Sequence, residues 1–578
     1  MRATSTFLIA LACFPAVGLS ASAEPVKKFE LGACSAPWLP KDARCGVYEV
    51  FENRAAKSGR KIPLQVVVLP ATGPQRLPDP FLYFAGGPGG PSIEEGLGFA
   101  MEMPELRKDR DVLLIDSRGT GLSAPLDCPE LRGDGSIQGF LDEFIPADKA
   151  RACRDRLQKT ADLTQYSSDY VTDDAEEIRT ALGYGKVNIM GTSYGTRTVQ
   201  VYMRRHPGSV RTATISGVVP MDESVPLFTA RHSQRALENL IVECEGDPAC
   251  HKAFPKLREE VAAVISRIQK EPVKLQVPSA QTGQPIEFTL SKGGFGQVLR
   301  RMLYYNPWIS LVPLYLHNAA NGDWQPLAEF AKVISEAQGS IGGYFLSVSC
   351  SEDLAFTREE EIPAAVAGTF LGDLRVRKQL EACKGWPAPK LGPEFRRPVT
   401  SGIPTLLLSG SADPVTPPSQ GDRVARTLKR GRHVVVEDGG HGLGGMQGGE
   451  CVERMITAFI QAGAAESLDT SCVARMRRPD FLLSLDPEVK LKPEELERLV
   501  GVWAGPNGGK FTTAVVGGYL RVDSPFGPAL LAATSPTRFR MRSGEPWLKL
   551  SFDLQDGRAV AMTLEMPGGT QTLKREGS

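Results

Sequence analysis

The sequence predicts an α/β fold with a mostly parallel sheet, a mainly helical insertion and a small β domain near the C-terminus. Three observations support this prediction. Short β-branched runs alternate with helix-like segments, a pattern typical of parallel strands joined by helices. From about residue 221 this alternation gives way to amphipathic helical stretches. After about residue 497, short strands with glycine turns replace almost all helix.

The expected core strands are short apolar runs. They occupy residues 47–51, 62–69, 81–84, 112–115, 187–190, 212–215, 405–408 and 433–436. The later runs are continuously apolar rather than alternating, as expected for parallel strands that are covered on both faces. Helices are expected between them at 172–182 and 198–206, and Asp173 and Asp174 suit the positive N-terminal end of the first helix.

The helical insertion is expected between the sixth and seventh core strands, where it forms a cap or lid. It contains helix-like stretches at 228–244 and 311–320 and one hairpin-like piece, VKLQVPSAQTGQPIEFTL. A linker near DPEVKLKPEE precedes the β domain. The predicted organisation is a signal peptide at 1–23, a first core part at 24–220, the cap at 221–398, a second core part at 399–485 and the β domain at 497–578.

The first residues have the layout of a cleaved export signal. Arg2 precedes an apolar stretch at 7–19, and the small residues Ala21 and Ala23 suit cleavage after about residue 23. A lipoprotein signal cut before Cys13 fits less well, because the apolar core before it is very short. We therefore expect a secreted or periplasmic protein without stable membrane insertion after signal cleavage.

The cysteine content agrees with an oxidising compartment. Of the 11 cysteines, Cys13 leaves with the signal, and none of the others forms a Cys-x-x-Cys pair. Such a set in an exported chain indicates disulfide bonds, although sequence alone does not fix their connectivity. The simplest expectation pairs neighbours in order along the chain, among Cys34, Cys45, Cys128, Cys153, Cys244, Cys250, Cys350, Cys383, Cys451 and Cys472.

A serine between two glycines stands after the fifth predicted strand. The segment VNIMGTSYGTRTVQ places Ser193 between Gly191 and Gly195, directly before a helix-like stretch. The Gly-x-Ser-x-Gly pattern is weak alone, but strand, glycine-flanked serine and helix together form the nucleophile elbow of α/β-hydrolases. We therefore predict an α/β-hydrolase fold with Ser193 as nucleophile. The alternative is an ordinary strand-to-helix turn.

A serine hydroxyl needs a base, and the base needs an acid that orients it. In this architecture both follow the serine, each just past a later strand. Of six histidines, only His441 lies in a glycine-rich loop after a predicted core strand, and Asp413 lies just past the preceding strand. Asp438 is a rival acid, but its place three residues before His441 fits a turn better. No histidine pair has metal-ligand spacing, so neither a metal nor another cofactor is expected.

Acyl transfer also needs donors for the oxyanion. One expected donor is the backbone N–H of Tyr194, directly after the nucleophile. The second is expected from the run AGGPGGPS after the third predicted strand, with Gly87 as first choice and Gly86 next. The alternative is a loop without function.

Several motifs occur in the order seen in the tripeptidyl aminopeptidase-like branch of the proline iminopeptidase family. They are GGPGGPS, DSRGTGLS, GTSYGT, GSADPVTP and GGHG, and the segments YYNPWISLVPLYLHNAANGDW, SVSCSEDLAF and CKGWPAP also resemble that branch. The resemblance covers roughly residues 40 to 475. It implies a secreted serine exopeptidase that acts on free N-termini. The sequence departs at Ala85, where relatives often have a histidine.

This resemblance implies further roles for residues outside the triad. Glu352 and Asp353 are the expected carboxylates for the substrate's α-ammonium group, the alternative being a solvated acidic turn or a helix cap. Asp116 and Arg118 are expected to brace the loop after the fourth strand. The β domain resembles lipocalin-like modules appended to exported hydrolases and is expected to be accessory, with a role in shielding the cleft.

The sequence thus predicts an exported serine aminopeptidase that forms an acyl-enzyme, with a peptide bearing a free N-terminus as its partner. One alternative is a carboxylic-ester hydrolase with the same triad, and another is a non-catalytic binding module that keeps the fold. Lys+Arg and Asp+Glu balance at 67 each, so no global charge attracts nucleic acid or anionic membrane. The number of residues removed and the oligomeric state stay open.

Overall fold

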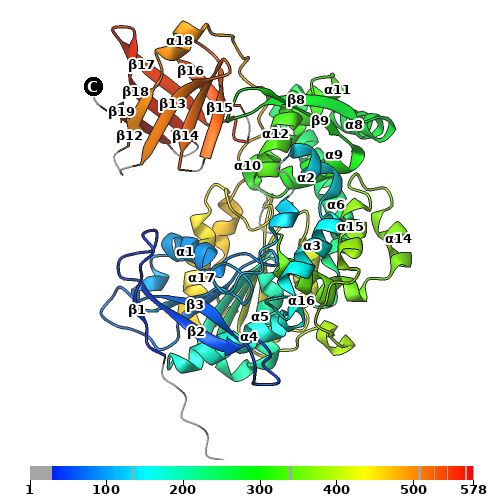
Figure 1. Ribbon diagram of the computed structural model, residues 1–578, viewed down its shortest axis with the longest axis vertical. Helices are drawn as coiled ribbons and strands as arrows, with labels where there is room; N and C mark the ends of the chain where they lie inside the picture. The colour runs from blue at the N-terminus through cyan, green and yellow to red at the C-terminus, as the bar shows by residue number, and fades with distance from the viewer. Residues whose placement is uncertain are drawn as a thin grey trace, which may run out of the picture.

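The computed structural model describes residues 29–132, 136–336, 341–505, 509–525, 527–542, 544–566 and 569–576. The predicted signal peptide at 1–23 lies outside these residues. Figure 1 shows an α/β core at the bottom, a helical cap above it and a β-barrel at the top. Among the described residues, no helix combines the length and the apolar character needed to cross a membrane.

A nine-stranded sheet forms the core, in the order β1-β2-β3-β5-β4-β6-β7-β10-β11. The strands β1 to β3 pair antiparallel, as do β3 and β5, whereas the strands from β5 to β11 in this order pair in parallel. The predicted mostly parallel sheet is therefore confirmed. Its strands are β1 (Gly32–Ala33), β2 (Arg44–Phe51), β3 (Lys61–Leu69), β4 (Phe81–Phe84), β5 (Val112–Ile115), β6 (Val187–Thr192), β7 (Val210–Ser216), β10 (Thr405–Gly410) and β11 (Gly431–Val436).

Helices cover both faces of this sheet, which explains the continuously apolar strands. On β4, Leu82 and Phe84 pack into one apolar cluster, and Phe81 and Tyr83 pack into another. The helices of the core are α1 (Ser92–Glu102), α3 (Ala147–Leu157), α4 (Ser168–Ala181), α5 (Gly195–Arg205), α16 (Pro418–Ala425) and α17 (Glu450–Ala462).

The loop after β5 is braced as the sequence analysis expected. The Asp116 carboxylate accepts the N–H groups of Ile93 and Leu122 at 2.9 and 2.8 Å. Arg118 Nε donates to Asp174 Oδ2 at 2.6 Å, and both side chains are buried. These contacts tie the end of β5 to α1 and α4.

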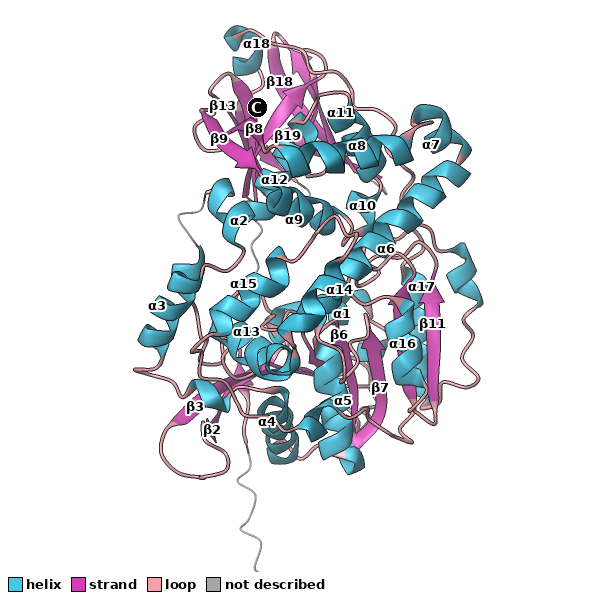
Figure 2. Cartoon of the chain, turned by 90° about the vertical axis from the view of Figure 1, so that its right-hand side faces the viewer, coloured by secondary structure: helices cyan, strands magenta, loops and turns pink. Residues whose placement is uncertain are grey.

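The cap between β7 and β10 is mainly helical, as Figure 2 shows. Cys350–Cys383 links two of its segments, and the cap joins the barrel through a hairpin and α12. Its elements are α6 (Val225–Gly246), α7 (Pro248–Ala253), α8 (Leu257–Lys270), β8 (Val273–Pro278), β9 (Pro285–Leu290), α9 (Lys292–Met302), α10 (Asn306–Ile309), α11 (Val312–Ala320), α12 (Gln325–Glu336), α13 (Gly343–Val348), α14 (Ile362–Val366) and α15 (Leu374–Cys383).

One helix of the first core segment packs with the cap. The helix α2 (Ile137–Glu143) buries Ile137 and Leu141 in the apolar cluster of the cap. Gln138 Nε2 also donates to the Thr289 carbonyl oxygen, at 3.1 Å, on β9. The cap is thus built from two separate stretches of chain, whereas the sequence analysis placed residues 137–143 in the core.

Five disulfide bonds pair the described cysteines as neighbours in order, which agrees with the simplest expectation. Three lie in the first and last parts of the core and two lie in the cap. They are Cys34–Cys45, Cys128–Cys153, Cys244–Cys250, Cys350–Cys383 and Cys451–Cys472.

The C-terminal β domain is a closed barrel with a packed interior. Trp503 is fully buried, its ring centroid lies 5.6 Å from that of Phe552, and its Nε1 donates to Thr513 Oγ1 at 2.9 Å. The elements are α18 (Pro493–Glu497), β12 (Gly501–Ala504), β13 (Lys510–Val516), β14 (Tyr519–Ser524), β15 (Gly527–Ala533), β16 (Arg538–Met541), β17 (Lys549–Gln555), β18 (Arg558–Met566) and β19 (Gly569–Arg575).

The barrel contacts the cap. Arg542 Nε lies 2.8 Å from Glu329 Oε1 on α12, and both side chains are largely buried. At the β8–β9 turn the backbone of the cap comes very close to the backbone of the barrel. A Cβ on Gly283 of the cap would lie only 2.5 Å from the Gly517 Cα of the barrel. An ion pair and a glycine contact therefore fix the barrel on the cap.

We expect Trp503→Ala to destabilise the barrel by about 3–5 kcal/mol, because a buried indole leaves a large cavity. Differential scanning calorimetry should show a barrel transition that moves to lower temperature. Val502→Ala, on the same strand but 36% exposed, is the matched control and should move this transition little. An unchanged barrel transition in Trp503→Ala contradicts the packing described here.

Candidate active site

Ser193 occupies a strained turn between β6 and α5. Its φ is 53°, a left-handed conformation that is uncommon for residues other than glycine. The flanking glycines are required by space: a Cβ on Gly191 would lie 2.3 Å from the Gly195 carbonyl oxygen, and a Cβ on Gly195 would lie 2.2 Å from the Phe84 carbonyl oxygen. The Ser193 N–H donates to the Ser216 carbonyl at 2.9 Å. This is the geometry of a nucleophile elbow.

The structure brings Asp413 and His441 together. Asp413 follows β10, His441 lies in the loop after β11, and His441 Nδ1 lies 2.8 Å from Asp413 Oδ2. The other oxygen of the carboxylate, Oδ1, accepts the N–H groups of Val415 and Thr416, each at 2.8 Å, and the Thr416 hydroxyl donates to Oδ2 at 2.6 Å. Asp413 is fully buried. The carboxylate therefore fixes the Nδ1 edge of the imidazole.

These contacts shift the pKa values of both groups. Burial alone would raise the pKa of Asp413, but the imidazole and the surrounding hydrogen-bond donors hold it below its usual range. Burial alone would lower the pKa of His441, but the Asp413 carboxylate outweighs burial and raises it above its usual range. The pair is thus arranged to stabilise an imidazolium ion.

The rival acid Asp438 has a turn geometry. Its φ is 56°, and its N–H donates to Ser411 Oγ at 2.8 Å. Within the described part of the chain, no hydrogen bond joins Asp438 to His441. The structure therefore places Asp413 beside His441, and the catalytic role of Asp413 stays a prediction.

Ser193 and His441 line one cavity of about 780 Å³. The loop after β7 lies between the two residues. The Ser193 N–H donates to the Ser216 carbonyl, and a Cβ on the next residue, Gly217, would lie 3.3 Å from His441 Cε1. The cavity is bounded by the glycine loop and α1 on the core side and by cap residues on the other. Its lining includes Gly86, Gly87, Glu95, Glu102, Phe140, Phe144, Gln297, Arg300, Arg301, Tyr304, Phe345 and Arg375.

The expected oxyanion donors lie beside the serine. In the described residues neither the Gly87 N–H nor the Tyr194 N–H donates to a protein acceptor. The Gly86 N–H instead donates to the Glu95 carboxylate, although a Cβ on Gly86 would lie only 3.1 Å from Ser193 Cβ. This arrangement favours Gly87 and Tyr194 over Gly86. All three roles stay predictions.

Glu352 and Asp353 do not lie where the sequence analysis expected. Both are buried, and neither lines the cavity. Glu352 Oε1 accepts the Ser168 N–H at 2.8 Å, and Asp353 Oδ1 accepts from Arg197 Nη1 at 3.0 Å. The reason is the π-helical turn at Ser349–Asp353, which directs both carboxylates inward, toward α4 and α5. Burial raises the pKa of Glu352 to about 7, although Arg197 opposes this shift.

The cap contributes polar residues to the cavity that were not predicted from the sequence. Arg300, Arg301 and Tyr304 come from α9 and the loop after it, and Arg375 comes from α15. None of the three arginines belongs to a recognisable motif, and Tyr304 begins the segment YYNPWISLVPLYLHNAANGDW, to which no site role was assigned. The only signal in the sequence is the adjacent pair Arg300 and Arg301. A sequence does not show which way their side chains point.

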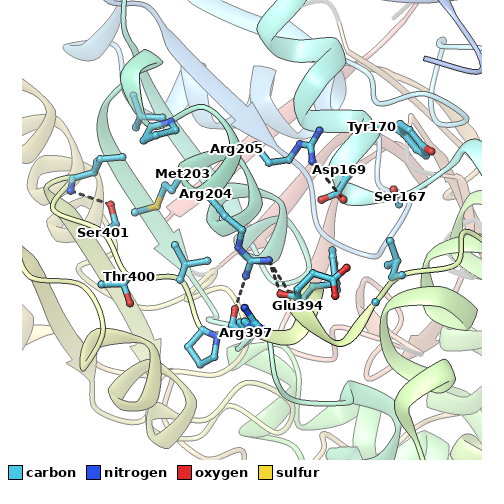
Figure 3. Close-up of a pocket in the computed structure, with 18 of the residues that line it drawn as sticks. Ser167, Asp169, Tyr170, Met203, Arg204, Arg205, Glu394, Arg397, Thr400 and Ser401 are labelled. Carbon is cyan, nitrogen blue, oxygen red and sulfur yellow. Dashed lines mark hydrogen bonds and ion pairs between the residues drawn. The ribbon is translucent and has the colours of Figure 1, made fainter. Parts of the chain in front are cut away.

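A larger cavity of about 1570 Å³ lies elsewhere. It adjoins Lys186, Val210 and Pro404, at the amino ends of β6, β7 and β10, whereas ligands of parallel α/β sheets bind at the carboxyl ends. Figure 3 shows Arg204 in this cavity, where it donates to the Phe395 carbonyl at 3.0 Å. Ser193 and His441 are absent from its lining, so the smaller cavity is the candidate active site.

Among the described residues, the grouping of metal-ligand types is Cys128, Glu130 and Cys153. Its two sulfur atoms form a disulfide bond. A disulfide is not the thiolate that binds metals, so this grouping does not fit a metal ion.

The fold and this site define an α/β hydrolase. Residues 79–237 match the family described as alpha/beta hydrolase fold, and residues 369–472 match the family described as TAP-like protein. The chain is therefore a serine hydrolase of the α/β-hydrolase class with a TAP-like segment, and the resemblance inferred from its motifs is confirmed.

Relatives match over most of the chain at low identity. The chain is 23% identical to serine protease Hip1 of Mycobacterium tuberculosis (strain H37Rv) over 489 residues, 75% of this chain and 88% of that protein. It is 24% identical to a tripeptidyl aminopeptidase of Streptomyces lividans over 488 residues, 76% and 85% of the two chains. It is also 23% identical to carboxylesterase B of Mycobacterium tuberculosis (strain CDC 1551) over 477 residues, 75% and 86%.

We expect hydrolysis to rise with pH and to reach its plateau at more alkaline pH than an ordinary histidine gives. The neutral imidazole is the base, and Asp413 raises the pKa of His441. Asp413→Asn should move the midpoint to lower pH, because the imidazolium loses its partner, and should lower the maximal rate about 10⁴-fold. The pH–rate profile of a soluble chromogenic ester measures both. A midpoint that stays in place in Asp413→Asn contradicts the coupling.

Proposed function

We propose that this protein is an exported serine exopeptidase that removes short peptides or single residues from free N-termini. The observation that carries the proposal is the buried Asp413–His441 hydrogen bond, 2.8 Å long, at the cavity that Ser193 also lines. Peptidase names among relatives that match three quarters of the chain support a peptide as substrate.

In the proposed mechanism, Ser193 Oγ attacks the carbonyl carbon of the scissile bond and His441 accepts its proton. The N–H groups of Gly87 and Tyr194 donate to the oxyanion, and the N-terminal end of α5 adds a favourable dipole. His441 then gives its proton to the leaving amine. Water, deprotonated by the same imidazole, hydrolyses the acyl-enzyme and restores Ser193.

The exopeptidase character rests on the bounded cavity and on the relatives. Cap residues line the cavity opposite the glycine loop, and its volume of about 780 Å³ suits a short bound part of the substrate. The ammonium group then has two carboxylates within the cavity, Glu95 and Glu102 on α1. These residues replace Glu352 and Asp353 in this role, because the latter pair is buried and does not line the cavity.

Export is part of the proposal. The five disulfide bonds of the described residues fit an oxidising compartment. Removal of residues 1–23 as a signal peptide would deliver the chain to the periplasm or the medium.

A carboxylic-ester hydrolase is the second candidate function. The same triad and oxyanion donors serve ester cleavage, and carboxylesterase B is among the relatives. Glu352 and Asp353, which the resemblance implies as partners of an ammonium group, lie outside the cavity, and an esterase does not need such partners.

We expect Ser193→Ala to lower the turnover of N-terminally free peptide amides by about 10⁶-fold, as loss of a serine nucleophile does. The exposed Ser471 gives the matched control, and Ser471→Ala should leave the rate unchanged. A fluorophosphonate should label the wild type but not Ser193→Ala. Retained turnover in Ser193→Ala rules out the assignment of the nucleophile.

The same assay separates the two candidate functions. Each peptide is compared with its N-acetylated twin, which lacks the ammonium charge. The exopeptidase should prefer the free amine, whereas equal rates on the twins, together with faster cleavage of esters, identify an esterase.

A further inference from the structure

Three arginines of the cap point to the kind of substrate that the cavity accepts. Arg300 and Arg301 lie in the last turn of α9, and Arg375 lies in the first turn of α15. All three line the cavity together with Ser193 and His441. Segments that are more than seventy residues apart in sequence therefore place three cations at the candidate active site.

The described contacts of this cluster involve no carboxylate. Arg300 Nε donates to Gln297 Oε1 at 3.2 Å, and the Arg300 and Arg301 guanidinium carbons lie 4.9 and 5.4 Å from the Tyr304 ring centroid. Arg375 lies 4.4 Å from the centroid of the Phe144 ring. Among the described residues, no ion pair joins any of the three to an aspartate or glutamate.

Two donors of the cluster are buried without an acceptor. They are Arg375 Nε and Gln297 Nε2, and Gln297 is 2% exposed. Buried polar groups in folded proteins almost always have a partner, because an unmade hydrogen bond in a place without water is costly. Both residues line the cavity, so the cluster keeps hydrogen-bond donors that no described protein group satisfies.

The electrostatics of the cluster are unfavourable without an anion. Burial, together with repulsion from Arg300 and Arg301, lowers the pKa of Arg375 to about 9. Burial also lowers the pKa of Arg301. Arg375 stands near the N-terminal end of α15, where the helix dipole repels a cation. Folded proteins keep buried cations where an anion pairs with them.

The carboxylates of the cavity belong to the opposite wall. Glu95 and Glu102 lie on α1, and Glu95 accepts hydrogen bonds from the Tyr83 hydroxyl, at 3.1 Å, and from the Gly86 N–H. Neither pairs with a cap arginine among the described contacts. The cavity thus has an acidic wall on the core side and a basic wall on the cap side.

We propose that Arg300, Arg301 and Arg375 bind a carboxylate of the substrate, so that the enzyme selects short peptides that carry an acidic side chain or a free C-terminal carboxylate. A planar guanidinium group matches a carboxylate with two parallel hydrogen bonds. This inference rests on the proposed function and names its substrate class.

The anion would lie close to the reacting atoms. The Tyr304 ring centroid, over which Arg300 and Arg301 lie, is 4.9 Å from that of His441. The Tyr304 carbonyl also accepts the backbone N–H of His441 at 2.9 Å. One aromatic side chain therefore separates the arginines from the imidazole, and the carboxylate bound there belongs to a residue near the scissile bond.

The first test compares peptides that differ in one charge. One arm exchanges Glu for Gln next to the scissile bond, and the other exchanges a free C-terminal carboxylate for its amide. We expect at least one charged twin to have a kcat/KM at least tenfold above its neutral twin, mainly through KM. The arm that shows the preference identifies the source of the carboxylate. Equal kcat/KM values in both arms overturn the proposal.

Variants then assign the preference to the cluster. Arg375→Gln and Arg301→Gln should reduce the ratio of charged to neutral kcat/KM to near one. Arg377→Gln is the matched control, because Arg377 lies on the same helix, is exposed and pairs with Asp373. Fluorophosphonate labelling of each variant verifies its fold. A charge preference that persists in folded Arg375→Gln and Arg301→Gln overturns the proposal.

A binding experiment separates this inference from the proposed function. Ser193→Ala is titrated by calorimetry with acetyl-Glu-amide against acetyl-Gln-amide, and with acetyl-Ala against acetyl-Ala-amide. At least one acid should bind tenfold more tightly than its amide, and Arg375→Gln in the same background should abolish the difference. This difference in binding should remain even if the protein proves not to be a peptidase. Equal binding within both pairs overturns the carboxylate site.

Discussion

The left-handed turn at Ser193 is the constraint on which the rest of the site depends. Parallel pairing places Phe84 beside Gly191 and Thr192 beside Ser216, so the loops that leave β4, β6 and β7 meet at one edge of the sheet. Any side chain at Gly191 or Gly195 would collide with backbone there. The turn can form only because both are glycine, and the same turn then places the Tyr194 N–H beside the serine hydroxyl.

The elbow is also the anchor of the cap. Arg197, on the helix that begins at the elbow, is fully buried and reaches Asp353 at 3.0 Å and the Glu223 carbonyl at 2.8 Å. Glu352 holds the N-terminal end of α4 through Ser168. The acidic pair therefore ties the returning segment of the cap to the core, and breaking such a buried pair commonly costs about 3–5 kcal/mol.

The core of the fold was predictable because its signals are local. Continuously apolar runs mark buried parallel strands, and the chain order of serine, acid and histidine follows the order of the strands that carry them. Glu352 and Asp353 were misplaced because a sequence does not show that a π-helical turn rotates two carboxylates inward. Arg375 and Arg300 were missed for a related reason: only tertiary packing brings α9 and α15 together over Ser193.

Hydrogen bonds join the cap to the loop that carries His441. The Tyr304 carbonyl accepts the backbone N–H of His441 at 2.9 Å. The Asn306 side chain accepts the Gly440 N–H at 2.6 Å and donates to the Gly444 carbonyl at 2.7 Å. The barrel supports the same region of the cap, because Arg542 pairs with Glu329 on α12.

A shift of the cap therefore disturbs the imidazole, since the loop that carries His441 is bonded to residues of the cap. A carboxylate bound by Arg300 and Arg301 would contact the segment that ends in Tyr304. Because the Tyr304 carbonyl accepts the backbone N–H of His441, a substrate held by these arginines would contact the same element that positions the base. The basic wall of the cavity thus connects the choice of substrate with the geometry of the triad.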